Sequence, residues 1–230
     1  MKTPVWYKKA AAVLLAACVA LGLTACGSEK EGSGGASAYE EYVIGIMDAN
    51  YLGQYETYME LTGSSQEDAK KLYDANIQDF ALEMEDALSI DQDSVSVALT
   101  ERMMEVAKNI YSQTKYEAVD VIREEDTYIV TLEIQPIAFF ETVEDAFGAA
   151  VDDFNERAKN GEFDELSDTQ YEEAYGEAVV EALEQNVSTV SYKAATAFDV
   201  VLDYDSENNI YAVSDEQMET LDSQVVSMAR

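Results

Sequence analysis

The hydrophobic pattern of this chain changes between two periods, and the order of the changes limits what the chain can fold into. Apolar residues first recur at the spacing of a helix, then alternate with polar residues as in a strand, and this succession then repeats. The pattern predicts helices over 39–61, 64–88, 93–112, 139–158, 167–183 and 214–228, and strands over 116–124, 127–135, 190–204 and 210–213.

A two-stranded ribbon is only marginally stable by itself, so each predicted hairpin needs a partner. The simplest arrangement joins both hairpins in one antiparallel sheet that is packed by the amphipathic helices, which is an α+β fold with a final C-terminal helix. A distorted version of this fold would resemble the cystatin-like or NTF2-like cone folds, an analogy that carries little functional weight.

Signals at the helix ends support these boundaries. Gly53 interrupts the first helical stretch and Gly63 ends it, because glycine readily adopts the left-handed conformation that closes a helix. Three segments have the form of capping boxes, in which a serine hydroxyl and a side chain three residues later satisfy free backbone N–H groups. They are Ser64-x-x-Glu67, Ser167-x-x-Gln170 and Ser214-x-x-Gln217.

Residues 1–25 have the organisation of an export signal. Lys2, Lys8 and Lys9 form a basic start without an acidic residue, and an apolar run follows over 10–23. A helix that spans a bilayer needs about 20 apolar residues, so this run is too short to be one.

The motif Leu23-Thr24-Ala25-Cys26 follows that run and resembles the lipobox of bacterial lipoproteins. The resemblance implies that the Cys26 thiol receives a diacylglyceryl group and that residues 1–25 are removed as a signal peptide. Acyl chains such as palmitate would then hold the protein in the cell membrane, at its outer, extracytoplasmic face. A single chain binds a membrane only marginally, whereas two or three hold a protein stably. The alternative is a plain signal peptide with a chance cysteine.

The chain after the signal divides into a tether and a folded part. Residues 27–38 are Gly, Ser, Ala and a few charged residues, so we expect 26–38 to be a lipidated cysteine with a flexible tether. The remaining residues, 39–230, are enough for a single α+β extracytoplasmic domain with a sizeable core.

The chain is strongly acidic. Its formal charge is −33, and removal of residues 1–25 takes away three lysines and no acidic residue, which gives −36. Such a surface repels nucleic acids and anionic lipid headgroups, so we expect no nucleic-acid partner. It favours cations and cationic partners, although a merely solvated acidic surface is also common in exported proteins.

Several residue types that carry enzyme chemistry are absent or already used. The chain has no His, which excludes Ser-His-Asp and Cys-His catalysis and imidazole metal ligands. Cys18 and the single Trp, Trp6, lie in the leader, and Cys26 is the predicted lipid attachment site. Disulfides and thiolate chemistry are therefore not expected in the mature chain, and the remaining candidates are Asp, Glu, Tyr, Ser, Lys and Arg.

One acidic turn has oxygen ligands at alternate positions, as a hard cation such as Ca²⁺ requires. If a metal site exists, its ligands would be Asp203, Asp205, Glu207 and Asn209. The turn departs from the EF-hand loop, because Asn208 stands where that loop has Gly and Ser214 where it has Glu. The alternative is an ordinary hairpin turn, in which Asp and Asn are favoured.

Carboxylate pairs and tyrosines are the other abundant groups. Paired acids such as those at 124–126, 152–153 and 172–173 could serve a glycosidase-like reaction, but with 47 acidic residues their proximity in sequence has little specificity. The tyrosines could line the core with their hydroxyls at its edge, or they could form a groove for a peptide or glycan.

The folded part also resembles exported lipoproteins of Gram-positive anaerobes that have no established activity. The segments that carry this resemblance are 51–55, 115–119, 128–132 and 134–137. We expect a non-enzymatic binding or envelope-associated module without a cofactor, whose partners are membrane lipid and an envelope protein, peptide or glycan. The alternative is a hydrolase that uses Asp or Glu, with Ca²⁺ as a candidate ion.

Overall fold

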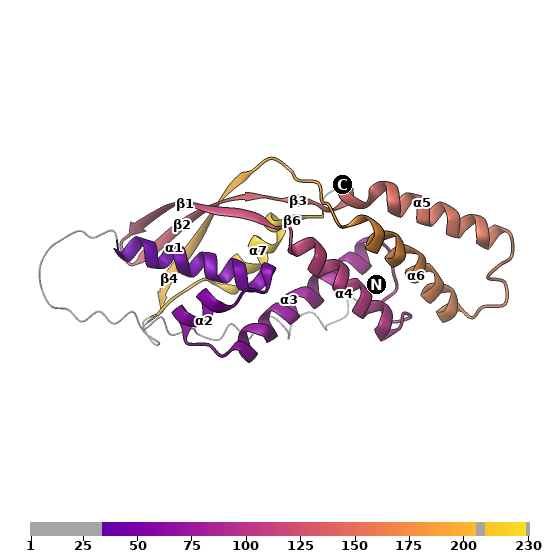
Figure 1. Cartoon of the computed structure of the whole chain (residues 1–230), viewed down its shortest axis with the longest axis horizontal. Coiled ribbons are helices and arrows are strands. Elements are labelled where there is room, and N and C mark those ends of the chain that lie inside the picture. Colours follow the sequence, from indigo (N-terminus) through magenta and orange to yellow (C-terminus); the bar gives the residue numbers. More distant parts are fainter. Residues whose placement is uncertain (1–33, 206–209, 229–230) are drawn as a thin grey trace, which may run out of the picture. The chain divides into compact units, whose positions relative to one another are not determined.

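The computed structural model describes residues 34–205 and 210–228 (Figure 1). The chain divides into two compact units, each built from segments that are separated in sequence. Among the described residues, the first unit comprises 34–75, 115–135, 195–205 and 210–225, and the second comprises 76–114, 136–194 and 226–228.

The first unit contains the predicted antiparallel sheet, in which both hairpins take part. Its strand order is β1 (Lys115–Glu124), β2 (Thr127–Gln135), β4 (Thr196–Asp205) and β5 (Ile210–Ala212). The central strands β2 and β4 pair from Thr127 with Asp203 to Ile134 with Thr196. The α+β expectation is therefore confirmed.

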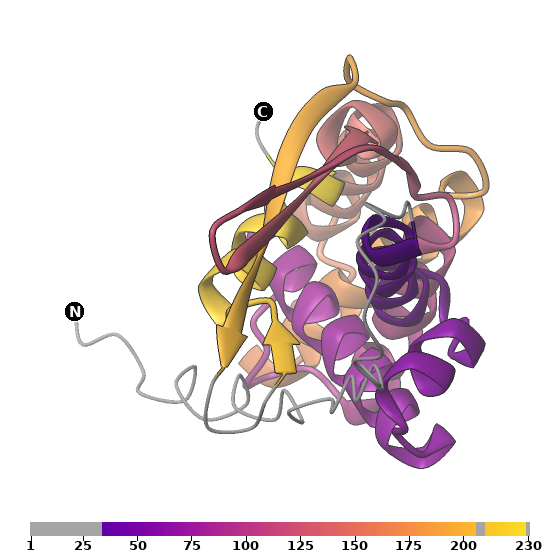
Figure 2. The same ribbon diagram turned by 90° about the vertical axis from the view of Figure 1, so that its left-hand side faces the viewer.

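Alternation along the strands produces one buried face. The side chains on this face are almost inaccessible to solvent; they include Val130, Leu132, Ile134, Val200 and Leu202. Helix α1 (Gly34–Met47) packs against β1 and β2, and α7 (Asp215–Val225) packs against β2 and β4. Figure 2 shows both helices on the same side of the sheet.

The side chain of Gln217 satisfies part of the free edge of β4. Its Oε1 accepts a hydrogen bond from the Val201 N–H at 2.7 Å, and its Nε2 donates to the Val201 carbonyl at 3.2 Å. The side chain thus replaces a neighbouring strand at this position. Of the capping box predicted for the same helix, the structure shows the bond from the Gln217 N–H to Ser214 Oγ, while the Gln217 side chain bonds to Val201 instead of closing the box.

The first unit is completed by short helices around two left-handed glycines. A π-helix, η2 (Asp48–Leu52), follows α1 and ends at Gly53, and α2 (Glu56–Thr62) ends at Gly63, as predicted. Helix α3 (Gln66–Ala87) begins one residue later than the sequence suggested. Ser65, rather than Ser64, accepts the Asp68 N–H, because the Ser64 Oγ accepts a bond from Thr62.

The second unit is mainly helical. It contains the C-terminal part of α3, α4 (Val97–Tyr111), α5 (Phe139–Lys159) and α6 (Asp168–Asn186). The predicted capping box at Ser167 and Gln170 is present at the start of α6. Phe154 stacks on Phe163 and meets Tyr171 and Tyr175 edge to face, which holds α5, the loop and α6 together.

A small parallel pair, β3 (Ile137–Ala138) and β6 (Val226–Ser227), belongs to this unit and explains an error in the predicted strand over 190–204. Tyr192 bridges to Ile137, and the Lys193 N–H donates to the Pro136 carbonyl. Residues 191–193 therefore pair beside β3, and β4 begins only at Thr196. Likewise, α7 ends at Val225 because the next two residues form β6.

One expected boundary also differs from the structure. Helix α1 begins at Gly34, so the last five residues of the predicted tether are helical. Within the segment expected to be a single domain, sequence-separated segments collect into two compact units. Hydrophobic periodicity locates elements along the chain but contains no information on how they are grouped.

Candidate functional site

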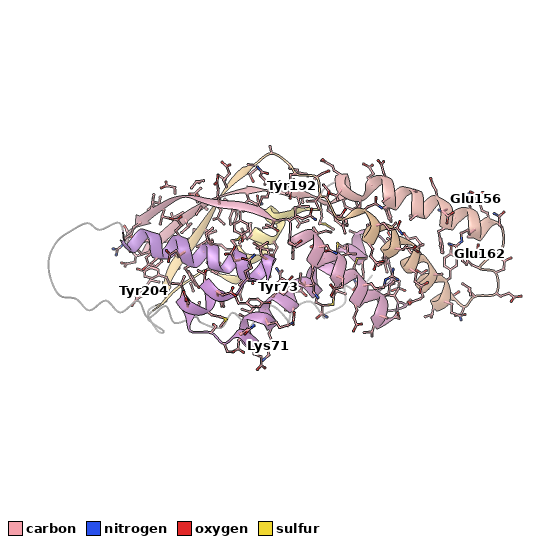
Figure 3. The ribbon with its side chains drawn as sticks, in the orientation of Figure 1. Lys71, Tyr73, Glu156, Glu162, Tyr192 and Tyr204 are labelled. Atoms are coloured by element: carbon pink, nitrogen blue, oxygen red, sulfur yellow. The ribbon has the colours of Figure 1, made fainter. Side chains whose placement is uncertain are left out.

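Four tyrosines gather at one end of the sheet, and we call them the tyrosine cluster: Tyr39, Tyr128, Tyr204 and Tyr211. They come from α1, β2, β4 and β5 of the first unit. Figure 3 shows Tyr204 at the end of β4. The strand pattern places these rings together, since Tyr128 pairs with Leu202 and Tyr204 pairs with Tyr211.

The rings form a compact aromatic group with one exposed side. Tyr39 stacks on Tyr128 with centroids 3.7 Å apart, and both rings meet Tyr211 edge to face at 5.1 Å. Tyr204 lies 5.2 Å from Tyr211 and is 42% exposed, whereas Tyr39 is buried. Aromatic pairs in these geometries contribute about 0.5–1.5 kcal/mol each beyond the area they bury.

Charged side chains surround the cluster. The Arg123 guanidinium lies over the Tyr128 ring, 5.4 Å from its centroid, and the exposed turn after β1 carries Glu125 and Asp126. Burial raises the pKa of Tyr39, with a further contribution from Tyr128. Burial and Tyr128 also raise the pKa of Tyr211, which Arg123 lowers and Asp126 raises.

Two tyrosines form hydrogen bonds to carboxylates around η2. The Tyr51 hydroxyl donates to Asp222 Oδ1 at 2.5 Å, and the Tyr116 hydroxyl donates to Asp48 Oδ1. Tyr51 is fully buried, and burial together with Asp48 raises the pKa of Tyr116. A π-helix often marks a functional position, but these hydroxyls are engaged within the fold and connect η2 to α7 and β1.

The predicted metal ligands are only partly visible. Asp203 is exposed and accepts a hydrogen bond from Thr127 Oγ1 at 3.3 Å. Glu207, Asn209 and the side chain of Asp205 lie outside the described part of the chain, as does Cys26. Within the described residues, the side chains of His, Cys, Asp and Glu form no group of three or more that could hold a metal ion.

Two of the three carboxylate groups noted in the sequence contain an acid with a structural partner. Glu173 accepts hydrogen bonds from the N–H and Oγ of Ser96, both at 2.6 Å, and so caps α4. Asp153 lies 3.7 Å from Arg157, which also pairs with Glu162 (labelled in Figure 3).

One unusual acid, Glu85 of α3 in the second unit, was not predicted from the sequence. Its side chain is fully buried, and neither carboxyl oxygen has a hydrogen-bond partner among the described residues. Burial raises the pKa of Glu85, and the nearby Thr100 hydroxyl opposes that shift. The only signal in the sequence is its position, four residues after buried Ala81 and three before buried Leu88.

The second unit also has a shallow surface hollow of about 350 Å³ along α4. It is lined by Ala98, Glu101, Arg102, Met104, Glu105 and Lys108. Both cations are paired, Arg102 with Glu184 at 2.8 Å and Lys108 with Glu105 at 2.6 Å. The hollow therefore offers less free charge and aromatic surface to a ligand than the tyrosine cluster does.

Comparison with known proteins supports the fold. The crystal structure of the "putative lipoprotein" YcdA from Bacillus subtilis is similar to this chain, with a TM-score of 0.60 and 13% sequence identity. The match covers 83% of this chain and 56% of YcdA, so this chain spans little more than half of the other. At this identity the likeness shows a shared fold alone.

No protein-family model matches the sequence, and no curated protein is similar to it. Among the described helices, none is long and apolar enough to cross a membrane.

Proposed function

We propose that this chain is a lipid-anchored protein of the extracytoplasmic face of the cell membrane, and that its tyrosine cluster binds a component of the cell envelope. The proposal rests mainly on the cluster itself, which combines an exposed aromatic surface with charged side chains. Tyrosine is favoured in binding surfaces because it is rigid, amphipathic and able to donate a hydrogen bond.

The place of the cluster in the chain supports an anchored binding role. Only eight positions separate Cys26 from Gly34, where α1 begins, and Tyr39 lies in the second turn of that helix. Eight residues span at most about 29 Å when fully extended. A lipid on Cys26 would therefore keep the cluster close to the membrane surface, where envelope components are concentrated.

The likeness to YcdA agrees with this proposal, since that protein is described as a "putative lipoprotein". We propose binding rather than catalysis because the cluster offers aromatic surface and charge. The described carboxylates with clear roles, such as Glu173 and Asp222, act as acceptors of structural hydrogen bonds.

Lipid attachment is tested with Cys26→Ala in the producing bacterium. We expect loss of labelling by radioactive palmitate and release of the protein from the membrane fraction. Cys18→Ala is the matched control and should leave labelling unchanged. Continued labelling of Cys26→Ala would refute the anchor.

Binding is tested with the chain from residue 26, produced without lipid as Cys26→Ala, on purified wall and membrane fractions. Tyr204→Ala should weaken saturable binding at least tenfold, because it removes the exposed ring of the cluster. Val97→Ala is the control, since Val97 is 77% exposed in the second unit. Equal binding by both variants would refute the cluster as the binding surface.

A further inference from the structure

Arg123 has an unusual environment for an arginine in so acidic a protein. Arg102 and Arg157 each make two hydrogen bonds to a carboxylate, that of Glu184 and that of Glu162. Arg123 instead places its guanidinium over the Tyr128 ring and donates from Nε to the Glu125 carbonyl at 3.1 Å. Its side chain is exposed, so it can leave the ring without disturbing the core.

The charges around the cluster favour a cation on these rings. The face of a tyrosine ring attracts cations through its quadrupole. Glu125 and Asp126 form the exposed turn that joins β1 to β2 beside the rings, and Asp126 raises the pKa of Tyr211. Glu124 and Asp203 both lie opposite Thr127, on the other face of the sheet. In a chain with a formal charge of −33, displacement of Arg123 from the ring would leave these two turn carboxylates beside the cluster, so the local field attracts a positive group and repels phosphate or other anions.

We propose that the tyrosine cluster binds the guanidinium group of an arginine on a partner peptide, and that Arg123 occupies this site as an internal competitor. The inference rests on the proposed function, because it names the ligand class of the same surface. The observed position of Arg123 shows that a guanidinium fits against Tyr128. A partner arginine would replace Arg123 on the ring, with the exposed Tyr204 and the half-buried Tyr211 beside it.

The contacts that hold Arg123 are weak enough to be displaced. An exposed cation–π contact and one hydrogen bond to a backbone carbonyl are both modest interactions in water. Together they would lower the apparent affinity for an external guanidinium by about 5- to 30-fold. Removal of Arg123 should therefore strengthen binding of an external guanidinium, whereas a residue that merely stabilised the site would weaken binding when removed.

The test is a titration of the chain from residue 26 (as Cys26→Ala), labelled with ¹³C in its tyrosine rings and followed by NMR. The probes are capped Gly-Arg-Gly, Gly-Lys-Gly and Gly-Glu-Gly peptides and a neutral N-acetylglucosamine oligomer. We expect the arginine peptide to shift the signals of Tyr128, Tyr204 and Tyr211 at the lowest concentration, and the glutamate peptide to have no effect. This order of probes tests the proposal without any substitution at Arg123.

Arg123→Gln should bind the arginine peptide about 5- to 30-fold more tightly. Lys115→Gln is the charge-matched control at the other end of β1, about 27 Å away along the strand and beyond the Debye length, so it should change affinity less than about twofold. Tyr204→Leu should weaken binding in both backgrounds.

Weaker or unchanged binding by Arg123→Gln would overturn the proposal, and so would tighter binding of the glycan than of the arginine peptide. If Tyr204→Ala weakens binding to the envelope fractions but the arginine peptide does not bind, the binding surface is supported and the proposed ligand class is wrong. If Tyr204→Ala binds the envelope fractions as well as the control does but the arginine peptide binds as expected, the proposed function is wrong and the cation site is supported.

Discussion

Glu85 offers the sharpest test of the energetics of this fold. Its carboxyl is fully buried in the second unit without a hydrogen-bond partner among the described residues. A buried polar group that lacks a partner costs about 1–3 kcal/mol, and a charged one costs more. We therefore expect Glu85→Met, which keeps the length of the side chain and removes its polar atoms, to raise the free energy of unfolding at pH 7 by at least about 1–3 kcal/mol.

The pH dependence follows from the direction of the pKa shift. Burial raises the pKa of Glu85 above its ordinary value of 4.5, so between these two values the folded protein holds a proton that the unfolded chain has lost. The part of the stability that depends on protonated Glu85 is therefore fully present below pH 4.5 and is lost as the pH rises through the pKa of Glu85 in the folded protein. The advantage of Glu85→Met over the wild type should grow by up to about 1.4 kcal/mol per pH unit in that window and then become constant.

Urea unfolding from pH 4 to 8 measures this difference, with hydrogen exchange of α3 and α4 peptides as a local readout of the second unit. Glu85→Gln is neutral at every pH, so it should remove the pH dependence that Glu85 causes but keep the cost of a buried polar group. Asp93→Asn, at an exposed position of the same unit, should leave the dependence unchanged. A Glu85→Met protein that is less stable than the wild type at pH 7, or a difference that is the same at pH 4 and pH 8, would refute the reasoning.

Two further substitutions test packing and edge protection. Gly176→Ala places a Cβ 2.5 Å from Leu99 Cδ2 in the buried contact of α4 and α6, whereas Gly148→Ala on α5 meets nothing within 4 Å. Thermal unfolding should show Gly176→Ala to be less stable than Gly148→Ala by about 2 kcal/mol, and equal stabilities would contradict the close packing. Gln217→Met removes both hydrogen bonds to Val201 and should lower the free energy of unfolding by about 1–2 kcal/mol, with faster exchange of the Val201 N–H by NMR. Protection of that N–H equal to the wild type would show that the side chain does not protect this edge.

The fold could largely be predicted because its signals are local. The residues of β2 that alternate toward the core, such as Val130 and Leu132, identify a strand whatever it pairs with. Ser167 and Gln170 form their capping box within a span of four residues. Residues 191–193 keep the alternating pattern but pair with 136–138, and the pairing partner of a strand is not a local property.

The site was harder to predict because its members are distant in sequence. The strand pattern puts Tyr204 on the same face as Leu202. Nothing in that pattern indicates that Tyr39 stacks on Tyr128 or that the Arg123 guanidinium lies over the Tyr128 ring. Glu85 was missed for a related reason. A glutamate in an amphipathic helix is normally exposed, and its burial depends on the helices that pack around it rather than on its own segment.

The surplus of tyrosine therefore has no single meaning in this protein. Tyr51 and Tyr116 donate their hydroxyls to carboxylates, and Tyr175 donates to the Leu88 carbonyl, so these rings serve the interior of their units. Within the tyrosine cluster, Tyr204 is the one exposed ring, and Arg123 lies over the neighbouring ring of Tyr128. A tyrosine is thus a candidate for binding when its ring face is exposed within an attractive field, and the count of tyrosines says little. Arg123→Gln isolates that property, since it changes the occupant of the ring face while every ring stays in place.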